Sequence, residues 1–159
     1  MSRLYIGIDP GNTGALAAIY PSGEVRLWDA PRNVPNEIEM AEIVHSLGDA
    51  IPRDEQFAVI EWAQSSPKMG VTSAFNYGCG FGMWLATLAS HDIGHVRVRP
   101  QEWMSMMFSG RKRLSRDKTR SIGLAKKLFP LAPITLAKHH GRAEALLIAE
   151  YGRRTYDGT

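Results

Sequence analysis

The stretch "LYIGIDPGNTGALAAIY", residues 4–20, joins two apolar runs through a tight turn. Residues 4–8 are typical of a buried strand, and residues 16–19 predict a second one. Asp9 stands at the end of the first run, directly before the turn sequence "PGN". A carboxylate at such a place is costly to bury unless it has a partner or binds a cation. Asp9 is therefore the first candidate for a functional side chain.

The composition is that of an ordinary globular protein. With 159 residues, 44% of them apolar and 22% charged, we expect one domain that spans 1–159. A single cysteine excludes a disulfide framework and a multi-thiolate zinc site, and it indicates a reducing compartment. The sequence has no secretion signal and no apolar run near the roughly 18 residues of a membrane span. We therefore expect a soluble, cytoplasmic protein with no membrane partner.

Charge is unevenly distributed along the chain, although the net charge is only +3 and the pI is about 9.2. Residues 29–55 hold seven acids against two arginines, whereas residues 111–127 hold eight bases against one acid. Those bases are Arg111, Lys112, Arg113, Arg116, Lys118, Arg120, Lys126 and Lys127. Such a basic stripe is expected for a polyanion partner, and the alternative is a solvated helix face.

The order of predicted elements indicates an α/β fold with a mixed sheet. Alternation and turn residues predict strands at 3–9, 14–20, 25–29, 57–62 and 95–100. Apolar periodicity predicts helices at 37–51, 71–90, 101–108, 116–129 and 141–154, with Asn36 as the cap of the first. The first three strands form an antiparallel meander, and the later ones alternate with helices. We therefore expect a mixed five-stranded sheet flanked by helices.

The helix expected at 71–90 carries a stripe of small residues. The stripe recurs every four residues and consists of Ala74, Gly78, Gly82, Ala86 and Ser90. Glycine costs about 1 kcal/mol against alanine in an exposed helix, so such residues indicate close approach of another backbone. One interpretation is tight packing on the protein's own sheet, and the other is contact with a second subunit.

A second acid, Glu61, ends the apolar strand "FAVI", as Asp9 ends the first strand. A third, Glu144, lies among apolar residues of the last helix, and His140 precedes it by four residues on the same helix face. His139 falls on a different side. Three carboxylates and an imidazole would form a site for a divalent metal, Mg²⁺ or Mn²⁺ rather than Zn²⁺. Glu150, by contrast, is expected to be a solvated partner of the two arginines that follow it.

The ordered motifs resemble one known family. "IGIDPGNTGALA", "VIEWAQSSPKMGVTSAFNYGCGFGMWLATL", "VRPQEW", "DKTRSIGLAKKLFP" and "KHHGRAEALLIAEYGRR" are similar to the RuvC family of Holliday-junction resolvases, with the phage and prophage RuvC-like endonucleases nearest. The resemblance covers nearly the whole chain. It implies an RNase H-like fold, a homodimer, and a crossover junction endodeoxyribonuclease that acts in a bacterial or phage-infected cell.

Carried over residue by residue, the resemblance implies that Asp9, Glu61 and Glu144 are catalytic metal ligands for two Mg²⁺ or Mn²⁺ ions. The family usually has a further acid just before the last one, where this chain reads "KHHGR". His140, or alternatively His139, is expected to take that role. The predicted DNA-binding residues are Lys68, Met69, Asn76, Arg111, Lys112, Arg113, Arg116, Lys118, Arg120 and Arg142. Met69 or Phe75 would wedge against unstacked bases, although Phe75 has a rival explanation as a core residue.

Three other functions remain open at this point. Sugar kinases and actin-like ATPases also begin with a strand, an aspartate and a hairpin, but they need two such lobes. A related nuclease could act on flaps, replication forks or RNA–DNA hybrids with the same metal chemistry. A junction-binding protein with weakened catalysis is the third, because histidines stand where the family has an acid.

Overall fold

The computed structural model describes residues 3–32, 36–48, 50–109 and 118–157, and for Lys118 the backbone only. Within these ranges the elements are β1 (Leu4–Asp9), β2 (Ala15–Ile19), β3 (Val25–Asp29), α1 (Glu37–His45), β4 (Gln56–Glu61), α2 (Val71–Ser90), β5 (Gly94–Val98), α3 (Pro100–Met107), α4 (Lys118–Leu128) and α5 (His140–Tyr156). Short 3-10 helices, Arg53–Glu55 and Ala137–His139, precede β4 and α5. Most predicted elements are confirmed to within two residues. The first helix is shorter than expected and ends before Gly48, where φ is 77°.

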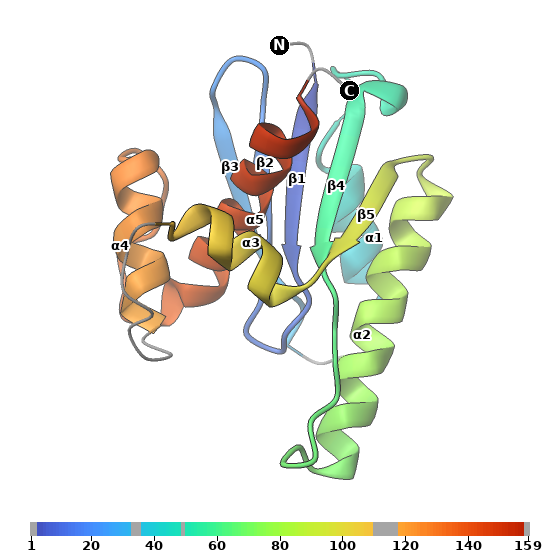
Figure 1. The fold of residues 1–159 in the computed structure, drawn as a ribbon. Coiled ribbons are helices and arrows are strands. Elements are labelled where there is room, and N and C mark those ends of the chain that lie inside the picture. The colour runs from blue at the N-terminus through green and yellow to red at the C-terminus, as the bar shows by residue number, and fades with distance from the viewer. Residues whose placement is uncertain (1–2, 33–35, 49, 110–117, 158–159) are drawn as a thin grey trace.

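The five strands form one mixed sheet in the order β3-β2-β1-β4-β5. β1, β2 and β3 are antiparallel neighbours, as the meander predicted. β4 lies parallel to β1 and β5 lies parallel to β4. The central strands β1 and β4 therefore run side by side and end at the same edge of the sheet, which points downward in Figure 1.

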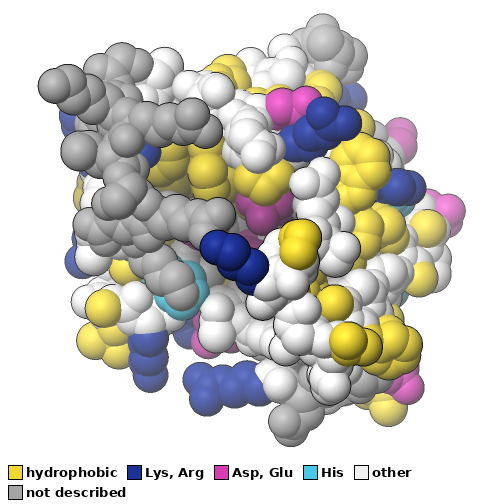
Figure 2. All heavy atoms as spheres, turned by 60° about the horizontal axis from the view of Figure 1, so that its bottom comes forward, with side chains coloured by type: hydrophobic (Ala, Val, Ile, Leu, Met, Phe, Trp, Pro, Cys, Tyr) yellow, Lys and Arg dark blue, Asp and Glu magenta, His cyan; other side chains and the backbone are white. Residues whose placement is uncertain are grey.

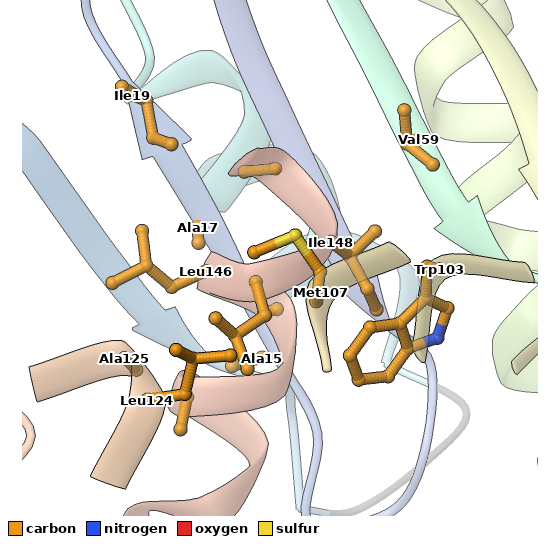
Figure 3. Packing of buried hydrophobic residues seen from close by; sticks show 14 of the residues in the cluster. Ala15, Ala17, Ile19, Val59, Trp103, Met107, Leu124, Ala125, Leu146 and Ile148 are labelled. Atoms are coloured by element: carbon orange, nitrogen blue, oxygen red, sulfur yellow. The ribbon is translucent and has the colours of Figure 1, made fainter. Parts of the chain in front are cut away.

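Helices cover both faces of the sheet and enclose a core on each side. One core joins β1, β2 and β4 to α1 and α2, and the other joins the opposite face to α3, α4 and α5. Figure 1 shows α5 crossing in front of β1 and β2 while α1 lies behind the sheet. The packing of α3 and α5 is shown in Figure 3, where Trp103, Met107, Leu146 and Ile148 gather next to the sheet.

α5 packs closely on the central strand because of one glycine. A Cβ added at Gly7 of β1 would collide with backbone atoms of Ala145 and Ala149 in α5. Residues 145–150 of this helix are buried without interruption. The close approach fixes the height of α5 over β1, and with it the position of Glu144.

The small-residue stripe of α2 is not packed on the protein's own sheet, so that interpretation is wrong for the single chain. α2 buries the opposite face, with Gly80, Trp84, Thr87 and Leu88. Gly78, Gly82 and Ala86 are exposed, and a Cβ at either glycine would meet no atom within 4 Å. The first half of α2 projects beyond the sheet, as Figure 1 shows, and in the second half the stripe lies on the helix face opposite Trp84 and Leu88.

Glu150 also departs from expectation. Its pairing is confirmed, because Arg153 and Arg154 donate to it at 2.6 and 2.7 Å. The residue is buried rather than solvated, with 2% of its surface exposed. Burial acts to raise the pKa of Glu150, but the hydrogen bonds from the two guanidinium groups more than offset it and lower the pKa. The described helices include none that is long and apolar enough to cross a membrane.

Candidate active site

Asp9 and Glu61 lie side by side because their strands are parallel neighbours. The register pairs Ile8 with Ile60, so the next residue of each strand is an acid. The parallel ends of β1 and β4 therefore present two carboxylates at one edge of the sheet, where α/β proteins commonly bind ligands. This placement follows directly from the two apolar runs that each end in an acid.

The turn after β1 fixes the carboxylate of Asp9. The Gly11 backbone N–H donates to Asp9 Oδ1 at 3.0 Å, and the Gly14 N–H donates to the Gly11 carbonyl at 2.8 Å. Asp9 is half-buried. The "PGN" sequence thus forms a turn that both reverses the chain and orients the acid.

Glu61 is held by a tryptophan from α3. Trp103 is fully buried, and its Nε1–H donates to Glu61 Oε2 at 2.8 Å. Burial raises the pKa of Glu61 to about 7, the Trp103 hydrogen bond opposes that rise, and the charge of Asp9 adds to it. A carboxyl group with a pKa this high is charged only part of the time at neutral pH unless a cation stabilises it. Such a perturbed acid is typical of a functional site.

Glu144 reaches the same region from α5. It is half-buried, and the hydroxyl of the buried Ser121 on α4 donates to its Oε1 at 3.4 Å. Burial raises the pKa of Tyr77 on α2, and the negative charges of Glu61, Asp9 and Glu144 raise it further. The charges of all three acids therefore reach this one phenol. Figure 2 turns this end of the molecule forward and shows acidic side chains in a recess between hydrophobic and basic ones.

His140 lies on the first turn of α5, one helical turn before Glu144, as predicted. Its Nε2 is 3.0 Å from the hydroxyl of Thr13 in the β1–β2 loop. The neighbouring position, Gly141, has no room for any side chain, because an added Cβ would collide with the Thr13 carbonyl. The chain therefore cannot carry an acid three residues before Glu144 without moving this loop.

The donor set suits a hard divalent cation in its chemistry. Its members are carboxylate oxygens from two strands and a helix, and a cation would relieve the repulsion that Asp9 exerts on Glu61. As the side chains stand, no three His, Cys, Asp or Glu residues in the described ranges are close enough together to hold a metal ion. Binding would require the carboxylates to turn toward a shared ion. The assignment of Asp9, Glu61, Glu144 and His140 as ligands stays a prediction.

The predicted DNA contacts are spread over several elements. Lys68 is exposed in the loop after β4, Met69 is half-buried in the same loop, and Asn76 is half-buried in α2. Phe75 is 68% exposed, so its explanation as a core residue is wrong. The guanidinium group of Arg120 lies over the ring of Phe108 at 4.0 Å.

Arg142 is already engaged within the fold. It donates through Nε and Nη2 to the two oxygens of Asp29 at 2.6 and 2.7 Å, and through Nη1 to the Pro133 carbonyl at 3.3 Å. Arg111, Lys112, Arg113 and Arg116, together with the side chain of Lys118, lie outside the described residues.

Two neighbours of the acids, Trp103 and Tyr77, could not be predicted from local sequence patterns. Trp103 stands 42 positions from Glu61, and Tyr77 lies on a glycine-rich helix segment that has no local polar pattern. Trp62 directly follows Glu61, is 39% exposed and lies 5.8 Å from the guanidinium carbon of Arg99. The position of a tryptophan directly after a strand-ending acid was the only feature of the sequence that pointed to the contact between Trp62 and Arg99.

A mixed sheet of this strand order, with an acid at the end of its first strand and helices on both faces, is an RNase H-like fold, as predicted. No protein-family model matches the sequence, and no curated protein matches it. Among solved structures, Thermus thermophilus RuvC in complex with a Holliday junction substrate is similar, with a TM-score of 0.64 and 14% identity over 97% of this chain and 96% of that one. A second structure of Thermus thermophilus RuvC gives a TM-score of 0.63 and 16% identity, covering 95% of each chain.

Proposed function

We propose that this protein is a metal-dependent, structure-selective endodeoxyribonuclease that nicks four-way junctions and other branched DNA. The observation that carries the proposal is the pair of acids, Asp9 and Glu61, at the adjacent ends of two parallel strands of an RNase H-like sheet. The charge of Glu144 acts on Tyr77 together with theirs, which supports its place as the third acid. The similar RuvC structure holds a Holliday junction substrate, which supports the choice of DNA over a nucleotide.

In the hydrolysis of a phosphodiester, an anionic nucleophile attacks the anionic phosphate, and an oxygen leaves as a further anion. A pair of Mg²⁺ or Mn²⁺ ions would lower the pKa of the attacking water and neutralise the departing oxygen. Asp9, Glu61 and Glu144 would hold these ions. Trp103 positions Glu61 through its 2.8 Å hydrogen bond, and the Gly11 N–H positions Asp9 in the same way. Both acids are thus oriented before the substrate arrives, which lowers the cost of assembling the site.

His140 would either complete the ligand set or orient and deprotonate the attacking water. An imidazole can both accept and donate a proton in acid–base catalysis. The Thr13 hydroxyl fixes one ring nitrogen, so the orientation of the imidazole depends on the β1–β2 loop. We expect His140→Ala to lose most of the cleavage rate while retaining junction binding.

The first half of α2 would enter the centre of the junction. Val71 and Phe75 are 88% and 68% exposed on the projecting part of this helix. Apolar side chains that protrude in this way can insert between base steps and hold them apart. The basic residues of the stripe at 111–127 and Lys68 would hold phosphates, which makes binding steeply salt-dependent.

The same helix would also join two copies of the chain. Gly78, Gly82 and Ala86 form an exposed face that a second helix backbone can approach closely. A symmetric dimer would supply two active sites for the two symmetric strands of a four-way junction. We expect Gly82→Leu to produce monomers by light scattering, whereas Gly123→Leu on the exposed face of α4 should leave the assembly unchanged.

Nicking assays test the function directly. Static four-way junctions, flaps, forks and linear duplex are incubated with the protein in Mg²⁺ and in Mn²⁺. We expect junction cleavage, and we expect Asp9→Asn and Glu61→Gln to abolish it while keeping junction affinity. Preferred cutting of flaps or forks would retain the chemistry and change the substrate, and cleavage by Asp9→Asn would remove that acid from the mechanism.

A second candidate is a junction-binding protein with weakened catalysis. It is favoured by Gly141, which leaves no room for a further acid on the face of Glu144, and by the absence of a ready three-ligand cluster among the described residues. Tight binding of four-way junctions without cleavage in either metal would select this function.

A further inference from the structure

A pocket of about 460 Å³ lies beside the acids but contains none of them. It is formed by the β1–β2 loop, the segment after β3 and the first residues of α5. The loop that lines it is the one that continues from Asp9, so the pocket and the acids share one end of the sheet. Figure 2 shows histidine and basic side chains on this end of the molecule.

The lining of the pocket carries an excess of positive charge. Arg32 and Lys138 are exposed cations among its lining residues. Asp29 is the only acid among the lining residues, and both of its oxygens accept hydrogen bonds from Arg142. Those bonds lower the pKa of Asp29, which keeps the pair ionised and mutually neutralised. The charges of Arg32 and Lys138 are therefore not cancelled by this acid.

His139 contributes a hydrogen-bond donor with a fixed tautomer. Its Nδ1 lies 3.2 Å from the Thr135 backbone nitrogen and 3.3 Å from that of Leu136, and both N–H groups donate to it. A nitrogen that accepts hydrogen bonds carries no proton, so the proton of the neutral ring resides on Nε2. His139 is one of the lining residues of the pocket, and Nε2 is the ring nitrogen left to donate there.

We propose that this pocket binds a backbone phosphate of the DNA, one that is not cut, on the strand that enters the active site. The inference rests on the proposed function. Two cations and an imidazole N–H around a concave surface are the donors that a phosphodiester requires. The first backbone N–H groups of α5 add partial positive charge at the same place. A phosphate anchored here, one loop away from Asp9, would set the register of the strand across the acids.

The test compares two arginines at opposite ends of the same region. Arg32→Gln removes a cation of the pocket, and Arg26→Gln removes one from the far end of β3, where Arg26 pairs with Glu24 at 2.7 Å. Binding of a fluorescent four-way junction is measured by anisotropy in EDTA over a range of KCl concentrations. Loss of one phosphate contact flattens the slope of log K against log[KCl] by about 0.9, which corresponds to about eightfold weaker binding at 0.1 M salt. We expect that change for each protomer of Arg32→Gln that contacts the junction, and not for Arg26→Gln.

A second variant removes the imidazole donor of His139 and keeps the hydrogen bonds that hold the beginning of α5 in place. In His139→Asn, the side-chain oxygen can still accept from the Thr135 and Leu136 N–H groups, but the Nε2 donor is lost. We expect a melting temperature near that of the wild type together with weaker junction binding. Titration calorimetry with inorganic phosphate measures whether the pocket also binds free phosphate, which distinguishes that ligand from a phosphate of the DNA backbone.

Equal salt slopes for Arg32→Gln and Arg26→Gln, in a protein that binds and cuts junctions, would overturn the inference and leave the proposed function intact. Phosphate binding that Arg32→Gln abolishes, combined with unchanged junction slopes, would assign the pocket to a free phosphate ligand and overturn it as well. A wild type that does not bind branched DNA would refute the proposed function, and this inference with it.

Discussion

Replacing Glu61 by glutamine should make the metal-free protein more stable at high pH. The folded environment raises the pKa of Glu61 from 4.5 to about 7, chiefly through burial. Each pKa unit corresponds to 1.36 kcal/mol, so ionising this group in the folded protein costs about 3 kcal/mol. Glutamine has the same shape, its oxygen can accept from Trp103, and it never ionises. The variant therefore avoids a cost that the wild type bears.

The sign of the effect follows from proton binding. Between pH 4.5 and about 7 the folded wild type binds more protons at Glu61 than the unfolded chain does. This contribution to stability is complete below pH 4.5 and is lost as the pH rises through 7. We expect the free energies of unfolding of Glu61→Gln and the wild type to be similar at pH 4.5. At pH 8 the variant should be more stable by about 3 kcal/mol.

Urea denaturation in EDTA at the two pH values measures the difference, with Glu42→Gln as a control at an exposed glutamate of α1. Adding Mg²⁺ at pH 8 should then stabilise the wild type and not the variant, because only the carboxylate gains from the ion. A difference between Glu61→Gln and the wild type that is the same at both pH values would refute a raised pKa at this position. It would also refute burial and the charge of Asp9 as causes that raise the pKa of Glu61.

Three further outcomes are expected. Trp103→Phe removes the donor that opposes the rise in the pKa of Glu61, so the acidic limb of the pH–rate profile should move up by about one unit; an unmoved limb would show that the hydrogen bond does not tune the acid. Phe75→Ala should reduce junction cleavage at least tenfold with little change in melting temperature, and a large loss of stability instead would return this residue to the core. Gly141→Ala should destabilise the protein by more than about 2 kcal/mol, because the new Cβ would collide with the β1–β2 loop. Gly123→Ala on α4 should instead stabilise it by about 0.5–1 kcal/mol, because a Cβ there meets no other atom. Thermal melts measure both changes.

Much of the fold could be read from local patterns. The apolar run before Asp9 and the alternation around residues 25–29 predicted the meander, and the structure confirms both. The bounds of α2, Val71–Ser90, match the prediction: Gly70 directly precedes the helix, and the chain turns at Asp92, where φ is 55°. The position of Asp9 beside Glu61 followed from two similar strands, since parallel neighbours end together.

Features that depend on contacts between distant segments could not be read in this way. The hydrogen bond from Trp103 to Glu61 joins α3 to β4 and leaves no periodic trace in the sequence. The burial of Glu150 was missed because two nearby arginines suggest that the acid is solvated. In the structure both arginines pair with Glu150, and the acid itself is buried in α5. The exposure of Phe75 depends on α2 extending past the sheet, which no local pattern encodes.

The close seating of α5 on Gly7 has a consequence for biosynthesis. A nascent chain that has emerged only as far as α4 already holds Asp9 and Glu61, yet Glu144 and the cover over the central strand are still missing. Such an intermediate would present bare apolar sheet to chaperones. Translation of the last helix would complete the core and bring Glu144 to the end of the sheet in a single event.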